Sequence, residues 1–151
     1  MTVRIEDIMV RDVLTVDAQS SVYDATVKMN DENVGCVVVV SDGEAVGILT
    51  ERDILRKIVV EKRDAEKTRV GDVMSAPLIT GEPDMSMEDA IKVMVLNRVK
   101  KLPILEDGRL VGIVTLFDIV RWEPIATNIL RGEYETREPP RNIKKYVIPV
   151  K

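Results

Sequence analysis

The sequence predicts an α/β (α+β) protein made of two pseudo-symmetric β-α-β-β-α repeats that pack together. Three observations predict this class. The second half of the chain repeats the first at a fixed offset, and both copies carry the same order of strand and helix signals. The chain also has 151 residues, 45% of them hydrophobic. At this size about 70% of the unfolded surface can be buried, so a real core can form.

The repeat is clearest in two short segments, GILTERDIL at 47–55 and GIVTLFDIV at 112–120, which lie 65 positions apart. The same offset aligns the rest of both copies without a gap. The identical pairs are Asp7 and Asp72, Met9 and Met74, Thr15 and Thr80, Ser21 and Ser86, Asp24 and Asp89, Ala25 and Ala90, Met29 and Met94, Val34 and Val99, Asp42-Gly43 and Asp107-Gly108, Val46-Gly47-Ile48 and Val111-Gly112-Ile113, Thr50 and Thr115, Asp53-Ile54 and Asp118-Ile119, and Arg56 and Arg121. Average composition would give only about three or four identities in fifty positions. The chain is therefore a duplication.

Each copy begins with a short extended stretch, VLTV or LIT, followed by a helix. A serine with an acid three residues later, Ser21 or Ser86, is typical of a helix start. In the second copy the apolar residues that share one helical face are Met87, Ala90, Ile91, Met94 and Val95. We expect the helix to end near Asn33 or Asn97.

Two buried strands and a last helix follow in each copy. VGCVVVV and KKLPIL are apolar runs that end at SDGE and EDGR, so a tight turn should join them to AVGILT and LVGIVT. The last helix should begin near Thr50 or Thr115. The predicted organisation is repeat 1 at 1–61, a charged linker at 62–69, repeat 2 at 70–122 and a C-terminal extension at 123–151.

Composition excludes several function classes. With 26 acidic against 22 basic residues and a pI near 5.0, a nucleic-acid partner is not expected. No apolar run approaches a membrane span or a signal peptide, so we expect a cytoplasmic protein. One cysteine and no histidine exclude intrachain disulfides, zinc clusters and histidine-dependent triads. With no nucleophile and base pair and no P-loop, we expect neither an enzyme nor a metal site.

The repeated motifs resemble a known family, the tandem cystathionine β-synthase (CBS) domain pair, also called a Bateman module. They are the D-x-M starts, the S-x-x-D-A helix entries, the DG turns and the G-h-h-T-x-x-D segments, where h is aliphatic, and they cover about Ile5 to Trp122. One departure is Val38, where the second copy has the proline of the family's LP pair, Pro103. We expect it to alter the strand edge slightly and to leave the fold unchanged.

The two T-x-x-D motifs, Thr50 with Asp53 and Thr115 with Asp118, allow two interpretations. Each fits a capping box, in which the threonine satisfies a free amide of the helix, worth about 1 kcal/mol. In CBS pairs the resemblance implies a second role, with threonine near a phosphate, aspartate on a ribose and aliphatic residues around adenine. The two roles are compatible.

The resemblance also implies two clefts, each made by both repeats. The residues expected to bind nucleotide in the main cleft are Ser20, Ala25, Val34, Gly35, Cys36, Lys100, Lys101, Ile113, Thr115 and Asp118. Those expected in the second cleft are Ile48, Thr50, Asp53, Met85, Ala90 and Val99. Only the main cleft has two lysines, Lys100 and Lys101, as expected phosphate contacts. At the matching positions the second cleft has Gly35 and Cys36. Arg52 or Arg56 could substitute in the second cleft, although we expect both to face solvent. Cys36 is otherwise a small buried hydrophobe.

Two functions remain open from the sequence. The favoured one is a regulatory module that binds an adenosine compound such as AMP, ADP, ATP or S-adenosylmethionine and signals to an effector protein that the sequence leaves unknown. The alternative is a ligand-independent structural or protein-interaction module whose T-x-x-D motifs are only caps. The family pairs such modules through helices, so we expect a homodimer. The extension at 123–151 is either a partly ordered tail or a partner-binding arm.

Overall fold

Two β-hairpins form the centre of the two repeats in the computed structural model, which describes residues 3–122. Strands β2 (Cys36–Ser41) and β3 (Glu44–Thr50) make the first, and β4 (Lys101–Glu106) and β5 (Arg109–Thr115) the second. Both residues of each DG turn have positive φ, from 49° to 80°. This is the conformation that a two-residue type I′ hairpin turn requires, so the predicted turns are confirmed.

Strand β1 (Thr15–Asp17) pairs in parallel with β2, but repeat 2 has no matching strand. There only an isolated bridge joins Gly81 to Ile104. In repeat 1 the amides of Val38 and Ala18 donate the outer hydrogen bonds of the pairing, to Leu14 and Val40. Residues 65 positions later are Pro103 and Pro83, which have no amide hydrogen to donate. The first strand that the sequence predicted for repeat 2, at LIT, is therefore absent, and the difference between Val38 and Pro103 changes the sheet more than the slight effect expected, while the hairpin stays intact.

The long helices start where the sequence predicts. Helix α2 (Val22–Asp31) is capped by Ser21 and α5 (Met87–Asn97) by Ser86, each serine hydroxyl accepting a hydrogen bond from the amide three residues later. Only this half of the capping box forms. The chain leaves α2 through Asn33 and α5 through Arg98, both with φ near 50°. Asn33 and Arg98 occupy matching positions of the two repeats. In repeat 2 the residue with positive φ is therefore Arg98, one position after the predicted helix end at Asn97.

The last helices begin at the predicted threonines but differ in form. Helix α3 (Glu51–Ile54) continues into a π-helical turn, η1 (Leu55–Val59), whereas α6 (Leu116–Trp122) is a regular α-helix. The π turn is closed by the amide of Val60, which donates to the carbonyl of Leu55.

Two short helices are exchanged between the repeats. Ile5 and Ile8 of α1 (Ile5–Ile8) are buried in the core of repeat 2, and Val70 and Val73 of α4 (Val70–Val73) in that of repeat 1. The exchange is pseudo-symmetric, because the Ile5 amide donates to the carbonyl of Met85 and the Val70 amide to that of Ser20. Each core therefore needs residues from both ends of the predicted linker.

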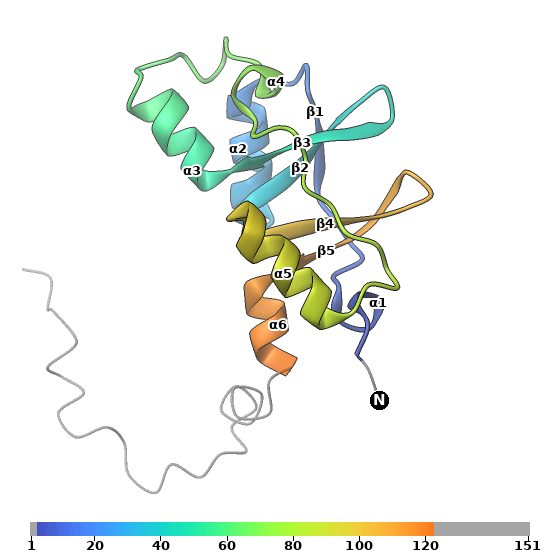
Figure 1. Ribbon diagram of the computed structural model, residues 1–151. Helices are drawn as coiled ribbons and strands as arrows, with labels where there is room; N and C mark the ends of the chain where they lie inside the picture. Colours follow the sequence, from blue (N-terminus) through green and yellow to red (C-terminus); the bar gives the residue numbers. More distant parts are fainter. Residues whose placement is uncertain (1–2, 123–151) are drawn as a thin grey trace, which may run out of the picture. The chain divides into compact units, whose positions relative to one another are not determined.

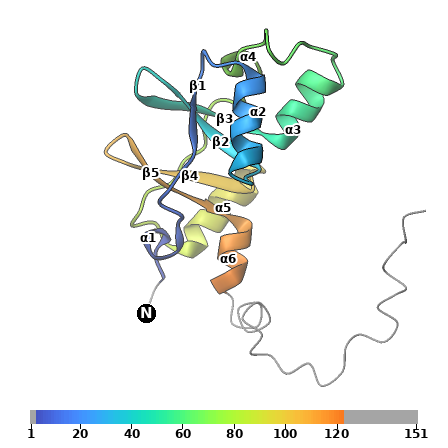
Figure 2. The same ribbon diagram turned by 180° about the vertical axis from the view of Figure 1, so that it is seen from behind.

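Both repeats, except the end of α6, belong to one unit, in which residues 3–119 are described. Figures 1 and 2 show the two hairpins side by side with their tips pointing the same way, and helices α2, α3 and α5 on the opposite side. The predicted α/β fold of two repeats is confirmed. The extension at 123–151 lies outside the described residues.

Candidate functional site

The T-x-x-D motifs form two matching helix caps. In repeat 1 the Asp53 Oδ2 accepts hydrogen bonds from the Thr50 amide and hydroxyl, at 3.0 and 3.1 Å, and the Asp53 amide donates to the threonine hydroxyl at 3.2 Å. In repeat 2 the same three distances, between Thr115 and Asp118, are 2.9, 3.0 and 3.1 Å. The predicted capping role is therefore confirmed for both motifs, and it occupies one carboxylate oxygen of each aspartate.

The second carboxylate oxygen distinguishes the two motifs. Asp53 Oδ1 accepts a hydrogen bond from the Ser75 hydroxyl at 2.9 Å and lies 3.4 Å from the Lys57 ammonium. Within residues 3–122, Asp118 Oδ1 has no hydrogen-bond or ion-pair partner. Asp53 is buried and Asp118 is half-buried. The two sites are thus unequal, for a reason other than the lysines that the sequence pointed to.

A cavity of about 310 Å³ lies beside Asp118. Of the residues predicted for the main cleft, those that line it are Val34, Gly35, Cys36, Lys101, Ile113, Thr115 and Asp118. Repeat 1 and repeat 2 both contribute, as the resemblance implied. The volume is at the lower end of the range for small-molecule sites.

Three residues predicted for this cleft lie elsewhere. Ala25 is only 1% exposed and belongs to the core of repeat 1. Ser20 uses its backbone carbonyl to hold the first amide of α4, and Lys100 is exposed and does not line the cavity. The core takes the position of Ala25 and the helix exchange that of Ser20, both of which the resemblance assigned to the cleft.

Sequence reasoning missed one wall of the cavity. The cavity is also lined by residues that were not assigned to the cleft, namely Val10, Asp12, Val13, Leu14, Glu32 and Val38. Most belong to the stretch between the D-x-M motif and β1. That stretch reaches repeat 2 because Val10 and Ile113 exchange two backbone hydrogen bonds, both of 2.9 Å. The aliphatic residues after D-x-M were the available signal.

The charged groups of the cavity are mostly acidic. Asp12, Glu32 and Asp118 line it, with Lys101 as the basic residue among them. The Lys101 ammonium lies beside the Cys36 thiol. Burial raises the pKa of this thiol, an effect that the lysine opposes and the Glu51 carboxylate reinforces. The thiol therefore stays protonated near neutral pH and is a packing group at the cavity wall.

The residues predicted for the second cleft lie in different surroundings. Ile48, Thr50 and Asp53 are neighbours, and the Ile48 backbone pairs with Ser75. Ala90 is fully buried in the core of repeat 2, and Val99 packs against that core. The predicted alternatives for its positive charge, Arg52 and Arg56, are both exposed as expected.

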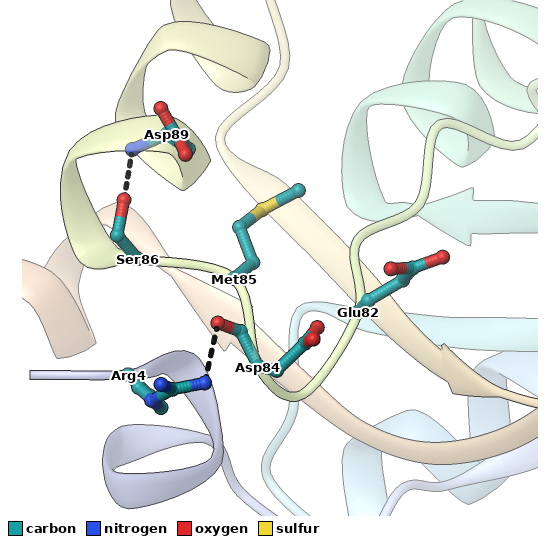
Figure 3. Close-up of a pocket in the computed structure, with 6 residues that line it drawn as sticks. All are labelled: Arg4, Glu82, Asp84, Met85, Ser86 and Asp89. Carbon is teal, nitrogen blue, oxygen red and sulfur yellow. Dashed lines mark hydrogen bonds between the residues drawn. The ribbon is translucent and has the colours of Figure 1, made fainter.

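Met85, also predicted for the second cleft, lines a different surface pocket at the start of α5. Figure 3 shows this pocket. The Asp89 amide donates a hydrogen bond to the Ser86 hydroxyl, and the Arg4 guanidinium donates a 3.4 Å hydrogen bond to the carbonyl of Asp84. Within residues 3–122 there is no group of three or more acidic or cysteine side chains arranged for a metal ion. The helices described in this part of the chain are too short or too polar to cross a membrane.

Comparison with known proteins identifies the family. The CBS domain model matches residues 5–60 and 70–124. MK0525 of Methanopyrus kandleri is 38% identical over 134 residues, which cover 87% of this chain and 68% of the relative. The CBS domain-containing protein YhcV of Bacillus subtilis is 39% identical over 115 residues, 76% of this chain and 81% of YhcV.

A solved structure supports the same assignment. The conserved CBS domain protein TA0289 of Thermoplasma acidophilum superposes with a TM-score of 0.76 at 31% identity, and the match covers 88% of this chain and 77% of TA0289. The resemblance predicted from the motifs is confirmed. The chain belongs to the CBS domain family and carries two tandem copies of a domain that is generally regulatory.

Proposed function

We propose that this protein is a regulatory module that binds one adenosine-type ligand in the cavity beside Asp118. The observation that carries the proposal is an aspartate that is held in place by its cap, lines a cavity and keeps one oxygen without a partner among residues 3–122. An ionised carboxylate in such a position can accept both hydroxyls of a ribose. The cap fixes the carboxylate before the ligand arrives, which lowers the entropy cost of binding.

The walls of the cavity fit the rest of a nucleoside. Aliphatic side chains from both repeats, including Val10, Val34 and Ile113, provide apolar surface for a flat base. Thr115 lies beside the proposed ribose position, and Lys101 supplies an ammonium group. A site made by both repeats also couples ligand occupancy to their packing, which is what a regulatory module requires.

The charges of the cavity favour some of the expected ligands over others. Lys101 can pair with one phosphate, but Asp12 and Glu32 would repel further negative charge. AMP, which carries a single phosphate, and S-adenosylmethionine, which carries cationic groups, therefore fit better than ADP or ATP.

The ligand-independent alternative has support only in repeat 1. There the Asp53 cap is complete without a ligand, since both carboxylate oxygens have protein partners. We assign Asp53 a structural role and Asp118 a binding role. The module is not proposed to be an enzyme, and it acts through an effector protein.

Calorimetry tests this function. AMP or S-adenosylmethionine should bind the wild-type protein. Asp118→Ala should lower the affinity for either compound by at least about tenfold, equivalent to about 1.4 kcal/mol of binding free energy. Lys101→Ala should reduce the affinity for AMP and leave adenosine almost unchanged, because it removes a phosphate contact only. Mass spectrometry of compounds released by heating the purified protein would identify a retained ligand. Absence of binding by adenosine, AMP, ATP and S-adenosylmethionine at millimolar concentration would favour the structural alternative.

A further inference from the structure

The Asp53 carboxylate is bound by side chains of the protein itself. Its Oδ1 accepts a 2.9 Å hydrogen bond from the Ser75 hydroxyl and lies 3.4 Å from the Lys57 ammonium. The same ammonium donates a 2.7 Å hydrogen bond to the carbonyl of Val73. Lys57 comes from the π turn η1, and Ser75 and Val73 from the exchanged helix α4 and the residues after it. Three segments therefore meet at one carboxylate oxygen.

The matching aspartate of repeat 2 lacks these partners for a reason visible in the sequence. The residues 65 positions away from Ser75 and Lys57 are Val10 and Trp122. Valine has no hydroxyl, and an indole cannot form an ion pair with a carboxylate. The two motifs share identical caps but differ at the two positions that decide whether the second oxygen is occupied.

The Asp53 carboxylate is buried, which makes its protein partners difficult for a ligand to displace. The Asp53 side chain is only 10% exposed, against 38% for Lys57. A hydrogen bond from the Ser75 hydroxyl and an ion pair with the Lys57 ammonium already occupy the oxygen that would accept a ribose hydroxyl. A ligand at Asp53 would have to displace both groups and leave the Lys57 ammonium with one partner fewer in a half-buried position, which is unfavourable.

We propose that Lys57 and Ser75 are the residues that restrict this chain to one adenosine-type ligand, because they occupy Asp53 in the way that a ribose would occupy Asp118. The inference rests on the proposed function for Asp118. It adds that the second site of the pair is closed by two specific side chains and can be reopened by changing them.

The variants follow from the repeat itself. Ser75→Val installs the side chain that repeat 1 has at the matching position, Val10. Lys57→Met removes the charge and keeps an unbranched chain of similar length. Lys57→Arg is the matched control, because it keeps a cation in reach of Asp53 and should keep the site closed. Circular dichroism and thermal melting of each variant check that it folds.

Binding stoichiometry measured by calorimetry with AMP, and separately with S-adenosylmethionine, tests the inference. We expect one ligand per wild-type chain, an affinity at least about tenfold lower for Asp118→Ala, and an affinity close to wild type again when Ser75→Val and Lys57→Met are added to Asp118→Ala. Adding Asp53→Ala to that triple variant should lower the affinity once more. If the double change destabilises the fold, Ser75→Val alone in the Asp118→Ala background should still raise affinity by about tenfold over Asp118→Ala.

The outcomes separate the two proposals. If the wild type binds one ligand and the opened variants gain none, Lys57 and Ser75 do not control the second site, and this inference is wrong while the proposed function stands. If the wild type binds two ligands, this inference is also wrong, and only the binding role of Asp118 stands. If neither the wild type nor the opened variants bind either compound, the proposed function fails and the inference fails with it.

Discussion

The thioether of Met9 lies directly over Gly112. Its Sδ is 2.5 Å from the position that a β-carbon on this glycine would occupy, and the Val10 carbonyl oxygen is 3.1 Å from it. The pseudo-symmetric pair in the other repeat is Met74 and Gly47, where the sulfur distance is 2.6 Å. The methionine of each D-x-M motif therefore packs on the glycine of the other repeat's G-I-x-T segment. The two motifs are therefore in direct contact in both halves of the structure.

Replacing either glycine by alanine should destabilise the protein. A β-carbon at 47 would also meet the Ser75 carbonyl oxygen at 2.9 Å, so the exchanged segment would have to move. Gly47→Ala should lower the free energy of unfolding by about 1 to 3 kcal/mol, measured by urea denaturation. Adding Met74→Ala should relieve only the sulfur contact and leave part of the cost. A neutral Gly47→Ala would mean that the segment is not held against β3.

The exchanged helix α1 should matter for the stability of repeat 2. Ile5 is fully buried in that core, so Ile5→Ala should lower the free energy of unfolding by roughly 2 to 5 kcal/mol. Glu6→Ala on the same helix changes an exposed side chain and should stay within about 0.5 kcal/mol of the wild type. Equal effects of the two substitutions would contradict the observed packing of α1.

The two capping aspartates should differ in their contribution to stability in the absence of ligand. Asp118→Ala removes a helix cap, which costs about 0.5 to 2 kcal/mol. Asp53→Ala removes a cap and also leaves Lys57 and Ser75 without their shared acceptor, for roughly another 1.5 to 3 kcal/mol. Thermal and urea unfolding of the ligand-free variants should therefore rank Asp53→Ala as the more damaging. The reverse order would remove the structural basis for calling the Asp53 site closed.

The Cys36 thiol provides a pH-dependent test of the cavity wall. Because burial raises its pKa, the thiolate fraction at pH 7.5 is smaller than for a free cysteine, and alkylation by iodoacetamide should be slow and accelerate as the pH rises. Lys101→Met removes the cation that lowers this pKa and should slow the reaction further. Bound AMP should also protect the thiol, since Cys36 lines the cavity. Fast alkylation at neutral pH would contradict the burial of the thiol.

Exposed apolar residues on the helices allow the expected homodimer to be tested. Val95 and Leu96 on α5 are 66% and 82% exposed, and Leu55 and Val59 beside α3 are 57% and 62% exposed. Light scattering at tens of micromolar should give the mass of two chains, and Leu96→Glu should shift it toward one. Arg109→Glu, at the start of β5 beside the hairpin turn, is the control and should leave the mass unchanged. A wild-type monomer under these conditions would refute the dimer.

Local signals in the sequence were sufficient for most elements of the fold. The DG turns, the serine caps and the threonine caps are each decided by a few adjacent residues, so the hairpins and the starts of α2, α3, α5 and α6 could be predicted. The missing strand of repeat 2 was less accessible. It depends on two prolines, Pro83 and Pro103, whose missing amides matter only once the neighbouring strand of the hairpin is known.

The sequence by itself determined the duplication and the caps, because a fixed 65-residue offset places the same short-range chemistry in both copies. The resemblance that its motifs carry also implied seven residues of the cavity wall. The tertiary structure alone decided which aspartate stays open. The occupied oxygen of Asp53 depends on Ser75, 22 positions away, which reaches it only because α4 is exchanged into the other repeat. Contacts between distant segments follow from packing, and no local pattern encodes them.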